Sequence, residues 1–524
     1  MRHKYSLLGE CSMRRLIAVS MLLATPLLMA VTTEKVTMGK MELDYCHIPN
    51  YSQEVLCGEY SVYEDRVAAK GRKIDIQFAV VPSITEAKEP DPLVFFAGGP
   101  GQGARDMGGF IQVAFAEIRE NRDIILIDQR GMGKSHSLAC EQPKDQPLSL
   151  TNEEQEKFTR EILQKCLTEL DADVTKYTQD LANEDINEII TALGYDKVNL
   201  YGVSWGTRSA LLYANQFPEQ IRTVIMDGNA PLENKVPLYA NEDAERALQT
   251  LFKDCATSKD CQKAFPLLEK DFNQVLADFG ENGYEVTMND ANTGKEITFT
   301  ITRSAFVNAV RSILYSPDFS RLLPIIIRQA KDRDFRAISG LMAAFGDGGM
   351  AMGAQMSVLC SEDYSRITNE AIALETSKGF VGNAFINYFT NACSVWPKAP
   401  LPEIYKQKLT SNAPTLILSG AIDPVTPGRW GEKMMEFMTN SKHLVAANTG
   451  HNVAPRGCTP KLMDQLIDQG NLDNIDGSCL DDLTRPTFFI DGNGPSSEVK
   501  IVDNDPEGSN PTMEEQNSKE KSND

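Results

Sequence analysis

Basic residues and histidines are scarce in this chain of 524 residues, and long apolar runs are almost absent. Lys and Arg number 52 against 73 Asp and Glu, which gives a formal net charge of -21 and a pI of about 4.8. This charge argues against nucleic-acid binding and against attraction to an anionic membrane, whereas it favours a ligand with a cationic group. With only five histidines, the chain offers few candidates for a catalytic base.

The one long apolar run lies near the N-terminus and predicts an export signal. Met13-Arg14-Arg15 precedes the apolar residues 16–31, a stretch that Pro26 interrupts and that is short for a membrane span. We interpret residues 1–30 as a signal peptide that is cleaved near Ala30, with Met13 as an alternative start. An uncleaved N-terminal anchor is the other interpretation. The expected destination is the periplasm or the medium, without stable insertion into a membrane.

Cysteine usage agrees with export. One of the 11 cysteines, Cys11, lies in the leader, which leaves an even number for disulfides. We expect neighbours in the sequence to pair, although the sequence leaves the connectivity open. The expected pairs are Cys46 with Cys57, Cys140 with Cys166, Cys255 with Cys261, Cys360 with Cys393, and Cys458 with Cys479. Because there is no C-x-x-C pair and no histidine at ligand spacing, a zinc site is not expected. No other metal or organic cofactor is implied either.

Short apolar runs alternate with helical patterns in the first half of the chain. A helix is expected at 182–193, where Ile186, Ile189 and Ile190 recur at helical spacing before Gly194. The alternation predicts a parallel α/β sheet, preceded by a β-ribbon within residues 46–83. The predicted parallel strands are 92–97, 123–128, 198–203 and 221–228.

The alternation stops after residue 231. Residues 232–410 are mostly helical, with a hairpin expected at 284–301, and strands return at 414–420 and 443–447. An insertion of this size predicts a lid domain over the carboxyl ends of the strands. The expected organisation is a signal peptide (1–30), the first part of the core (31–231), a helical lid (232–410), the second part of the core (411–495) and a disordered acidic tail (496–524).

The stretch VNLYGVSWGT at residues 198–207 predicts a strand, a sharp turn and a helix. Ser204 at such a turn is the candidate nucleophile, although the pattern G-x-S-x-G alone is weak. His451 follows the last strand and is the candidate base. Asp423 follows the preceding strand and is the candidate acid, with Asp227 as its rival. The order Ser, Asp, His is that of the α/β-hydrolase fold.

Acyl transfer also needs donors for the oxyanion. The backbone N–H of Trp205 is one candidate, and the N–H of Gly99, with Gly98 as alternative, is the second. Arg130 is expected either to brace this glycine loop or to form a surface salt bridge. The glycine stretches lack the spacing of phosphate-binding loops.

The motifs GGPGQG, DQRGMGKS, GVSWGT, GAIDPVTP and TGHN occur in this order within residues 90–460. Together they resemble the secreted tripeptidyl-aminopeptidase-like branch of the α/β-hydrolase peptidases related to proline iminopeptidases. The resemblance implies a serine exopeptidase that acts on peptides with a free N-terminus, under a large helical lid. Ala97 stands where proline iminopeptidases usually carry histidine, so prolyl specificity does not follow.

In that family, carboxylates of the lid bind the α-ammonium group of the substrate. The matching residues are Glu362 and, second, Asp363. A solvated acidic pair beside a disulfide is the structural alternative. The predicted function is thus an exported aminopeptidase, with a carboxylesterase or a non-catalytic binding protein as alternatives. The oligomeric state is left open.

Overall fold

The computed structural model describes residues 35–141, 150–290, 293–345 and 349–495. The predicted signal peptide (1–30) and the predicted disordered tail (496–524) lie outside the described residues. No helix within the described ranges combines the length and hydropathy that a membrane span requires.

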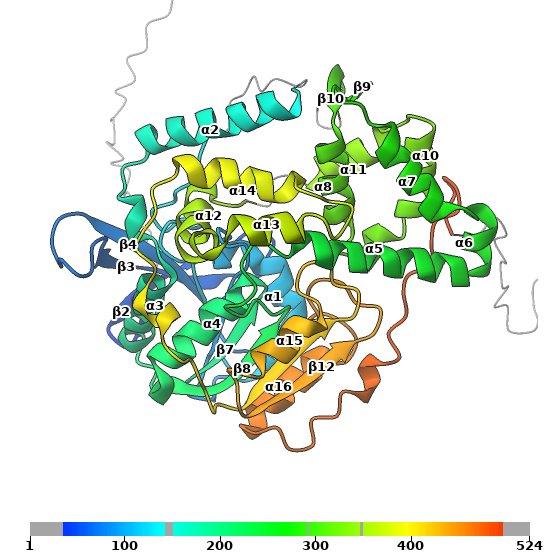
Figure 1. Ribbon diagram of the computed structural model, residues 1–524. Coiled ribbons are helices and arrows are strands. Elements are labelled where there is room, and N and C mark those ends of the chain that lie inside the picture. The colour runs from blue at the N-terminus through cyan, green and yellow to red at the C-terminus, as the bar shows by residue number, and fades with distance from the viewer. Residues whose placement is uncertain (1–34, 142–149, 291–292, 346–348, 496–524) are drawn as a thin grey trace, which may run out of the picture. The chain divides into compact units, whose positions relative to one another are not determined.

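A ten-stranded sheet, seen below the inserted helices in Figure 1, has the strand order β1-β2-β3-β4-β6-β5-β7-β8-β11-β12. The strands β1, β2, β3 and β4 are antiparallel to their neighbours. The remaining six strands, β6, β5, β7, β8, β11 and β12, are parallel to one another. The strands are β1 (Lys35–Met38), β2 (Met41–Cys46), β3 (Val55–Tyr63), β4 (Lys73–Val81), β5 (Leu93–Phe96), β6 (Ile124–Ile127), β7 (Val198–Val203), β8 (Ile221–Asp227), β11 (Thr415–Gly420) and β12 (Ser441–Ala446). The predicted, mostly parallel α/β-hydrolase sheet is confirmed.

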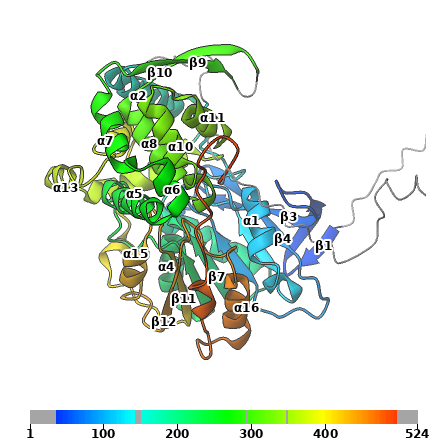
Figure 2. The same ribbon diagram turned by 90° about the vertical axis from the view of Figure 1, so that its right-hand side faces the viewer.

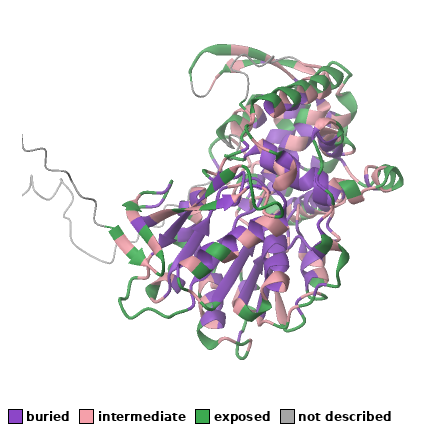
Figure 3. Cartoon of the chain, turned by 90° about the vertical axis from the view of Figure 1, so that its left-hand side faces the viewer, coloured by how far each residue is buried: buried purple, intermediate pink, exposed green. Residues whose placement is uncertain are grey.

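The central parallel strands are apolar because helices cover both of their faces. Every residue of β5, β6, β7 and β11 is buried, as Figure 3 shows for the strands at the centre of the sheet. The helix expected at 182–193 is present, and Ile186, Ile189 and Ile190 are its buried face. The helices of this part are α1 (Gly108–Ala114), α2 (Asn152–Glu169), α3 (Gln179–Ala192), α4 (Trp205–Gln216), α15 (Gly428–Met434) and α16 (Thr459–Gln469).

A mainly helical insertion separates β8 from β11 (Figure 2). It contains the expected antiparallel hairpin. Its elements are α5 (Ala240–Thr257), α6 (Lys259–Ala264), α7 (Leu268–Asp278), β9 (Tyr284–Asn289), β10 (Glu296–Ile301), α8 (Arg303–Ile313), α9 (Pro317–Ser320), α10 (Leu323–Lys331), α11 (Arg336–Phe345), α12 (Met352–Val358), the π-helix η5 (Leu359–Asp363), α13 (Asn369–Glu375) and α14 (Ala384–Val395).

The insertion divides between two hydrophobic cores. Helices α5, α7, α8 and α10 share a core of their own, which includes Phe272 and Phe306. Helices α12 and α14 instead contribute Met356 and Phe389 to the core of the sheet. Helix α2, which the sequence did not predict, lies beside α14, where Arg160 donates to Asn391. The lid boundaries at 232 and 410 stay a prediction.

All five disulfide pairings expected from sequence proximity are confirmed. They join Cys46 to Cys57, Cys140 to Cys166, Cys255 to Cys261, Cys360 to Cys393, and Cys458 to Cys479. The fourth ties η5 to α14, so the segment that carries the two candidate amine-binding carboxylates is covalently attached to a helix of the sheet core.

Two glycines allow the turn between β7 and α4 to form. A Cβ atom on Gly206 would lie 2.0 Å from the carbonyl oxygen of Phe96 in the neighbouring strand, and one on Gly202 would lie 2.4 Å from the carbonyl oxygen of Gly206. Both distances are far below van der Waals contact, so the helix and the strand approach this closely only without side chains. This is the physical reason for the glycines of the G-x-S-x-G pattern.

The substitution Gly206→Ala is therefore expected to destabilise the chain by about 2–4 kcal/mol or to prevent folding, because the new methyl group overlaps backbone rather than a movable side chain. Gly280→Ala is the matched control, since no heavy atom lies within 4 Å of its Cβ position. The control is expected to change stability by about 0.5 kcal/mol or less. Urea unfolding midpoints measure both effects, and equal midpoints would contradict the close approach at Gly206.

Candidate active site

Ser204 occupies the turn between β7 and α4 in a strained backbone conformation. Its φ and ψ are 56° and -124°, and a positive φ is costly for a residue with a side chain. Its N–H donates to the carbonyl oxygen of Asp227 at 2.8 Å, which fixes the turn on the neighbouring strand. The loop of Gly98 passes directly over the serine, because a Cβ atom on Gly98 would lie 3.6 Å from Ser204 Oγ.

His451 and Asp423 are brought together by the loops after β12 and β11. His451 Nδ1 lies 2.8 Å from Asp423 Oδ2, and both side chains are buried. Asp423 also accepts hydrogen bonds from the N–H groups of Val425 at 2.7 Å and Thr426 at 2.9 Å, and from the Thr426 hydroxyl at 2.7 Å. The carboxylate is thus held rigidly on one ring nitrogen, and the other nitrogen is left for proton transfer.

The charges of this pair stabilise each other. Burial alone would lower the pKa of His451, but the neighbouring carboxylates of Asp423 and Asp227 outweigh it, and the pKa is raised from its ordinary value. Burial alone would raise the pKa of Asp423, but His451 and the donors of Thr426 outweigh it, and that pKa is lowered. An ionised Asp423 therefore faces an imidazole that readily accepts a proton.

Asp227, the rival acid, has a different position. Its carboxylate accepts from the N–H groups of Val453 at 2.8 Å and Ala454 at 2.9 Å, and from the Tyr201 hydroxyl at 2.8 Å. Burial raises the pKa of this carboxyl. Asp227 thus binds the backbone just after His451, whereas Asp423 binds the imidazole itself.

The predicted oxyanion donors lie on two segments beside the serine. Trp205 is the first residue of α4. Gly99 has φ 109°, in the region that only glycine adopts readily, and a Cβ atom on it would lie 3.0 Å from the sulfur of Met350. The N–H of Ala351 donates to the carbonyl oxygen of Gly101 at 2.9 Å. The insertion therefore contacts the glycine loop directly.

Arg130 forms neither of the two expected contacts, because its hydrogen-bond partners are Asp185, Glu64 and Lys176 instead of the glycine loop or a surface carboxylate. It is 1% exposed and binds Asp185 of α3 through two hydrogen bonds of 2.7 and 2.8 Å. The carboxylate that holds the end of the glycine loop is Asp128, which accepts from the N–H groups of Arg105 and Lys134, both at 3.0 Å. An acceptor can bind two backbone donors at a sharp turn, which a guanidinium cannot.

Glu362 and Asp363 lie side by side in η5 but have different partners. Asp363 accepts from Arg208 at 2.5 Å, from Arg366 at 2.6 Å and from the N–H of Val236 at 3.1 Å. Both carboxyl groups are fully buried, so the alternative of a solvated acidic pair is wrong. Asp363 is the counter-ion of Arg208, one helical turn after Ser204.

Glu362 is held by neutral donors. It accepts from the N–H of Gln179 at 2.7 Å and from the hydroxyl of Tyr405. Burial raises its pKa to about 8, and the hydrogen bonds from Tyr405 and Gln179 counteract this only in part. The carboxyl is therefore protonated at neutral pH unless a cation approaches it.

Three site residues were missed by the sequence analysis. The Thr426 hydroxyl lies 3.1 Å from His451 Nδ1 in addition to its bond with Asp423. Arg246 of α5 donates to the carbonyl oxygens of Ala421, at 2.9 Å, and Asp423, and so holds the acid loop from the insertion. Arg208 lies one helical turn after Ser204 on α4, and this spacing in the sequence could have indicated that its side chain lies near the site. Arg246 offered no such indication, because it is 177 residues from its partner.

Comparison with known proteins agrees with this fold. Residues 91–283 match the family model of the alpha/beta hydrolase fold, and residues 378–479 match the model described as TAP-like protein. Serine protease Hip1 of Mycobacterium tuberculosis is 23% identical over 478 residues, which cover 85% of this chain and 87% of Hip1.

Two further relatives cover less of the chain. The tripeptidyl aminopeptidase of Streptomyces lividans is 25% identical over 220 residues, or 39% of this chain and 41% of that protein. The proline iminopeptidase of Neisseria gonorrhoeae is 29% identical over 146 residues, or 27% of this chain and 34% of that enzyme. The chain is therefore a serine hydrolase of the α/β-hydrolase fold with a match to the TAP-like model, and it is similar to the peptidases that the order of its motifs predicts.

Proposed function

We propose that this chain is an exported serine exopeptidase that removes residues or short peptides from free N-termini, in the manner of a tripeptidyl- or prolyl-aminopeptidase. The observation that carries the proposal is the fully buried carboxyl of Glu362, whose hydrogen-bond partners are neutral. Its neighbour in the sequence, Asp363, pairs with Arg208 on the helix that follows Ser204. A site of this kind gains most from a ligand with a positive charge.

The proposed reaction is acyl transfer to Ser204. His451 takes the proton of the serine hydroxyl as Oγ attacks the scissile carbonyl carbon, and Asp423 stabilises the resulting imidazolium. The N–H groups of Trp205 and Gly99 bind the oxyanion. The imidazolium then protonates the leaving amine, and water hydrolyses the acyl-enzyme with His451 as the base.

Recognition of the free N-terminus is assigned to Glu362. An α-ammonium group that is removed from water needs an anionic partner, and it would displace the proton that burial holds on this carboxyl. Asp363 is neutralised by Arg208 and Arg366. It therefore supports the site by holding η5 against α4. The sequence analysis had named Asp363 as the second candidate for direct contact with the α-ammonium group.

Export is the remaining part of the proposal. The five disulfides support it, because such bonds persist in oxidising compartments outside the cytosol. We expect residues 232–410 to act as the lid that restricts access to Ser204, which would favour peptides over folded proteins.

The two buried aspartates are expected to differ sharply in their effect on catalysis. Asp423→Asn leaves the imidazole in the wrong tautomer, so kcat is expected to fall on the order of 10⁴-fold. Asp227→Asn is the matched control, and it is expected to lower stability while kcat falls less than about tenfold, because Asp227 binds backbone rather than the ring. Initial rates on a tripeptide nitroanilide, with Ser204→Ala as baseline, measure both values of kcat. A larger loss of kcat with Asp227→Asn than with Asp423→Asn would show that Asp227 is the acid of the triad.

The proposed amine site predicts a substrate-dependent effect of Glu362→Gln. For a peptide with a free amine, kcat/KM is expected to fall about ten- to a hundredfold, because a charge-assisted hydrogen bond is lost. The N-acetylated peptide is expected to be a poor substrate of the wild type and to be unaffected by the change. Glu375→Gln is the control, since Glu375 is also buried in the insertion but pairs with Lys378 at 2.8 Å.

Other outcomes of this comparison would change the proposal. Equal cleavage of the free and acetylated peptides by the wild type would exclude an aminopeptidase. Turnover of p-nitrophenyl esters alone would favour a carboxylesterase. The absence of turnover with every substrate class would favour a binding protein on a hydrolase scaffold.

Glu362 also predicts a pH dependence of stability. The unfolded chain ionises this residue near its ordinary pKa of 4.5, whereas the folded chain retains the proton up to about 8. The folded state therefore binds more protons between these values, and the wild type should lose stability relative to Glu362→Gln as the pH rises from about 4.5 to about 8, by at most about 1.4 kcal/mol per pH unit. Urea unfolding at pH 5, 6.5 and 8 measures the difference, and a constant difference would contradict it.

A further inference from the structure

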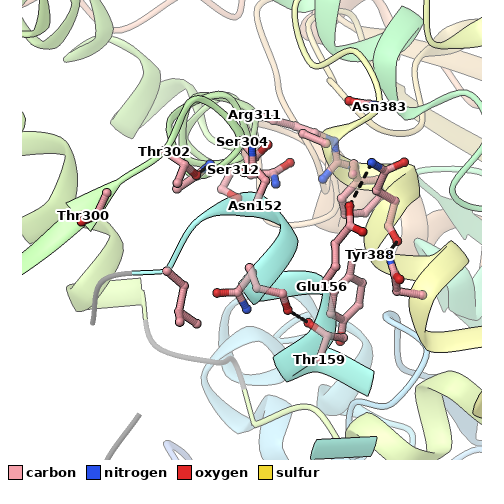
Figure 4. Close-up of a pocket in the computed structure, with 18 residues that line it drawn as sticks. Asn152, Glu156, Thr159, Thr300, Thr302, Ser304, Arg311, Ser312, Asn383 and Tyr388 are labelled. Atoms are coloured by element: carbon pink, nitrogen blue, oxygen red, sulfur yellow. Dashed lines mark hydrogen bonds between the residues drawn. The ribbon is translucent and has the colours of Figure 1, made fainter. Parts of the chain in front are cut away.

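A cavity of about 650 Å³ lies between helices α2, α8 and α14 (Figure 4). This volume is in the range of pockets that hold small ligands. Most of the lining side chains end in amides or hydroxyls, the groups that pair with peptide bonds. They include Asn152, Thr159, Ser304, Asn308, Asn383 and Tyr388.

Arg311 gives this cavity a positive charge. Figure 4 shows its side chain leaving α8 toward the α14 side of the cavity. The side chain is 94% buried, since only 6% of the residue is exposed, and its Nε has no hydrogen-bond partner in the described part of the chain. Its guanidinium carbon lies 4.2 Å from the ring centroid of Phe385 and 5.5 Å from that of Tyr315.

No carboxylate of the described residues pairs with Arg311. Glu156 also lines the cavity, but it accepts from Asn387 at 3.3 Å and forms no ion pair with Arg311 within the described ranges. The Oδ1 atom of Asn308 is also buried, and it has no hydrogen-bond partner among the residues that the structure describes. Buried arginines normally have an anionic partner, because removing an unpaired charge from water is unfavourable. Among the described residues, the charge of Arg311 in this cavity is therefore not balanced by an ion pair.

The cavity adjoins the candidate catalytic histidine through one aromatic ring. Tyr315 contacts Arg311 on one side and His451 on the other, where the ring centroids are 5.2 Å apart. The carbonyl oxygen of Tyr315 also accepts from the N–H of His451 at 2.8 Å. An extended peptide spans roughly 3.3–3.6 Å per residue. The two centroid distances of 5.5 and 5.2 Å place the guanidinium carbon of Arg311 no more than about 11 Å from the imidazole of His451, a span of roughly three extended residues.

We propose that this cavity, here named the Arg311 cavity, binds a carboxylate of the peptide substrate while its scissile bond lies at Ser204. Arg311 is the anion-binding and specificity-determining residue, and the surrounding amides hold the peptide backbone. The inference rests on the proposed peptidase function. Two sources supply the same chemistry: the C-terminal carboxylate of a short peptide and an acidic side chain near the scissile bond.

The test uses the full chain and tetra-alanine with a free N-terminus. Its free-acid and C-terminally amidated forms are compared. For each position of the amidated peptide, a variant with glutamate is also compared with a variant with glutamine at that position. Wild type is expected to prefer one carboxylate-bearing form about ten- to a hundredfold in kcat/KM. The preferred form identifies the source. Arg311→Gln should abolish the preference, and Arg311→Lys should retain part of it.

Arg303→Gln is the matched control, because Arg303 lies on the same helix but donates to the carbonyl oxygen of Phe380. It should leave the preference intact. A wild type that cleaves all forms equally, or an Arg311→Gln variant that slows all forms equally, would overturn the proposal while the peptidase function stands. If the wild type cleaves no peptide, the proposed function fails instead. Calorimetric binding of the acid and amide forms to Ser204→Ala then tests the cavity alone, and equal affinities would overturn it.

Discussion

The buried ion pair between Arg208 and Asp363 connects the parts of the molecule that the candidate site requires. Both side chains are fully buried, and their nearest atoms are 2.5 Å apart. Arg208 also donates to the carbonyl oxygens of Ala230, Pro231 and Asn234, where the insertion begins. Because removing either partner leaves an unpaired buried charge, the nucleophile helix and η5 are held to each other.

This coupling places chemistry from distant parts of the sequence in one region. Glu362 is part of η5, which the ion pair of Asp363 holds against the helix of Ser204, and the disulfide between Cys360 and Cys393 attaches the same segment to α14. Arg246 holds the loop of Asp423 from the other part of the insertion. The inserted helices therefore do more than cover the sheet, since they also bind the loops that carry two members of the candidate triad.

Environment, rather than residue type, distinguishes the buried carboxyl groups of this region. Asp423 faces an imidazole and its pKa is lowered, whereas Asp227 faces backbone donors and its pKa is raised by burial. Glu362 has neutral partners, and its pKa reaches about 8. The pKa values of three buried acidic side chains are thus shifted in different directions or to different extents because of what each contacts.

The sequence by itself determined the α/β sheet, the turn of Ser204 and the order of the candidate triad, and it suggested the disulfide pairs while leaving their connectivity open. These features depend on neighbours along the chain: apolar runs predict buried strands, and Gly202 and Gly206 allow a turn that larger residues would block. Helix α2 was missed because its mean hydropathy is low and only Thr159, Leu163 and Cys166 are buried. The tertiary structure alone decided which aspartate binds His451, that Asp128 rather than Arg130 holds the glycine loop, and that Asp363 is neutralised by Arg208. Each of these depends on contacts between residues far apart in the chain, which no local pattern records.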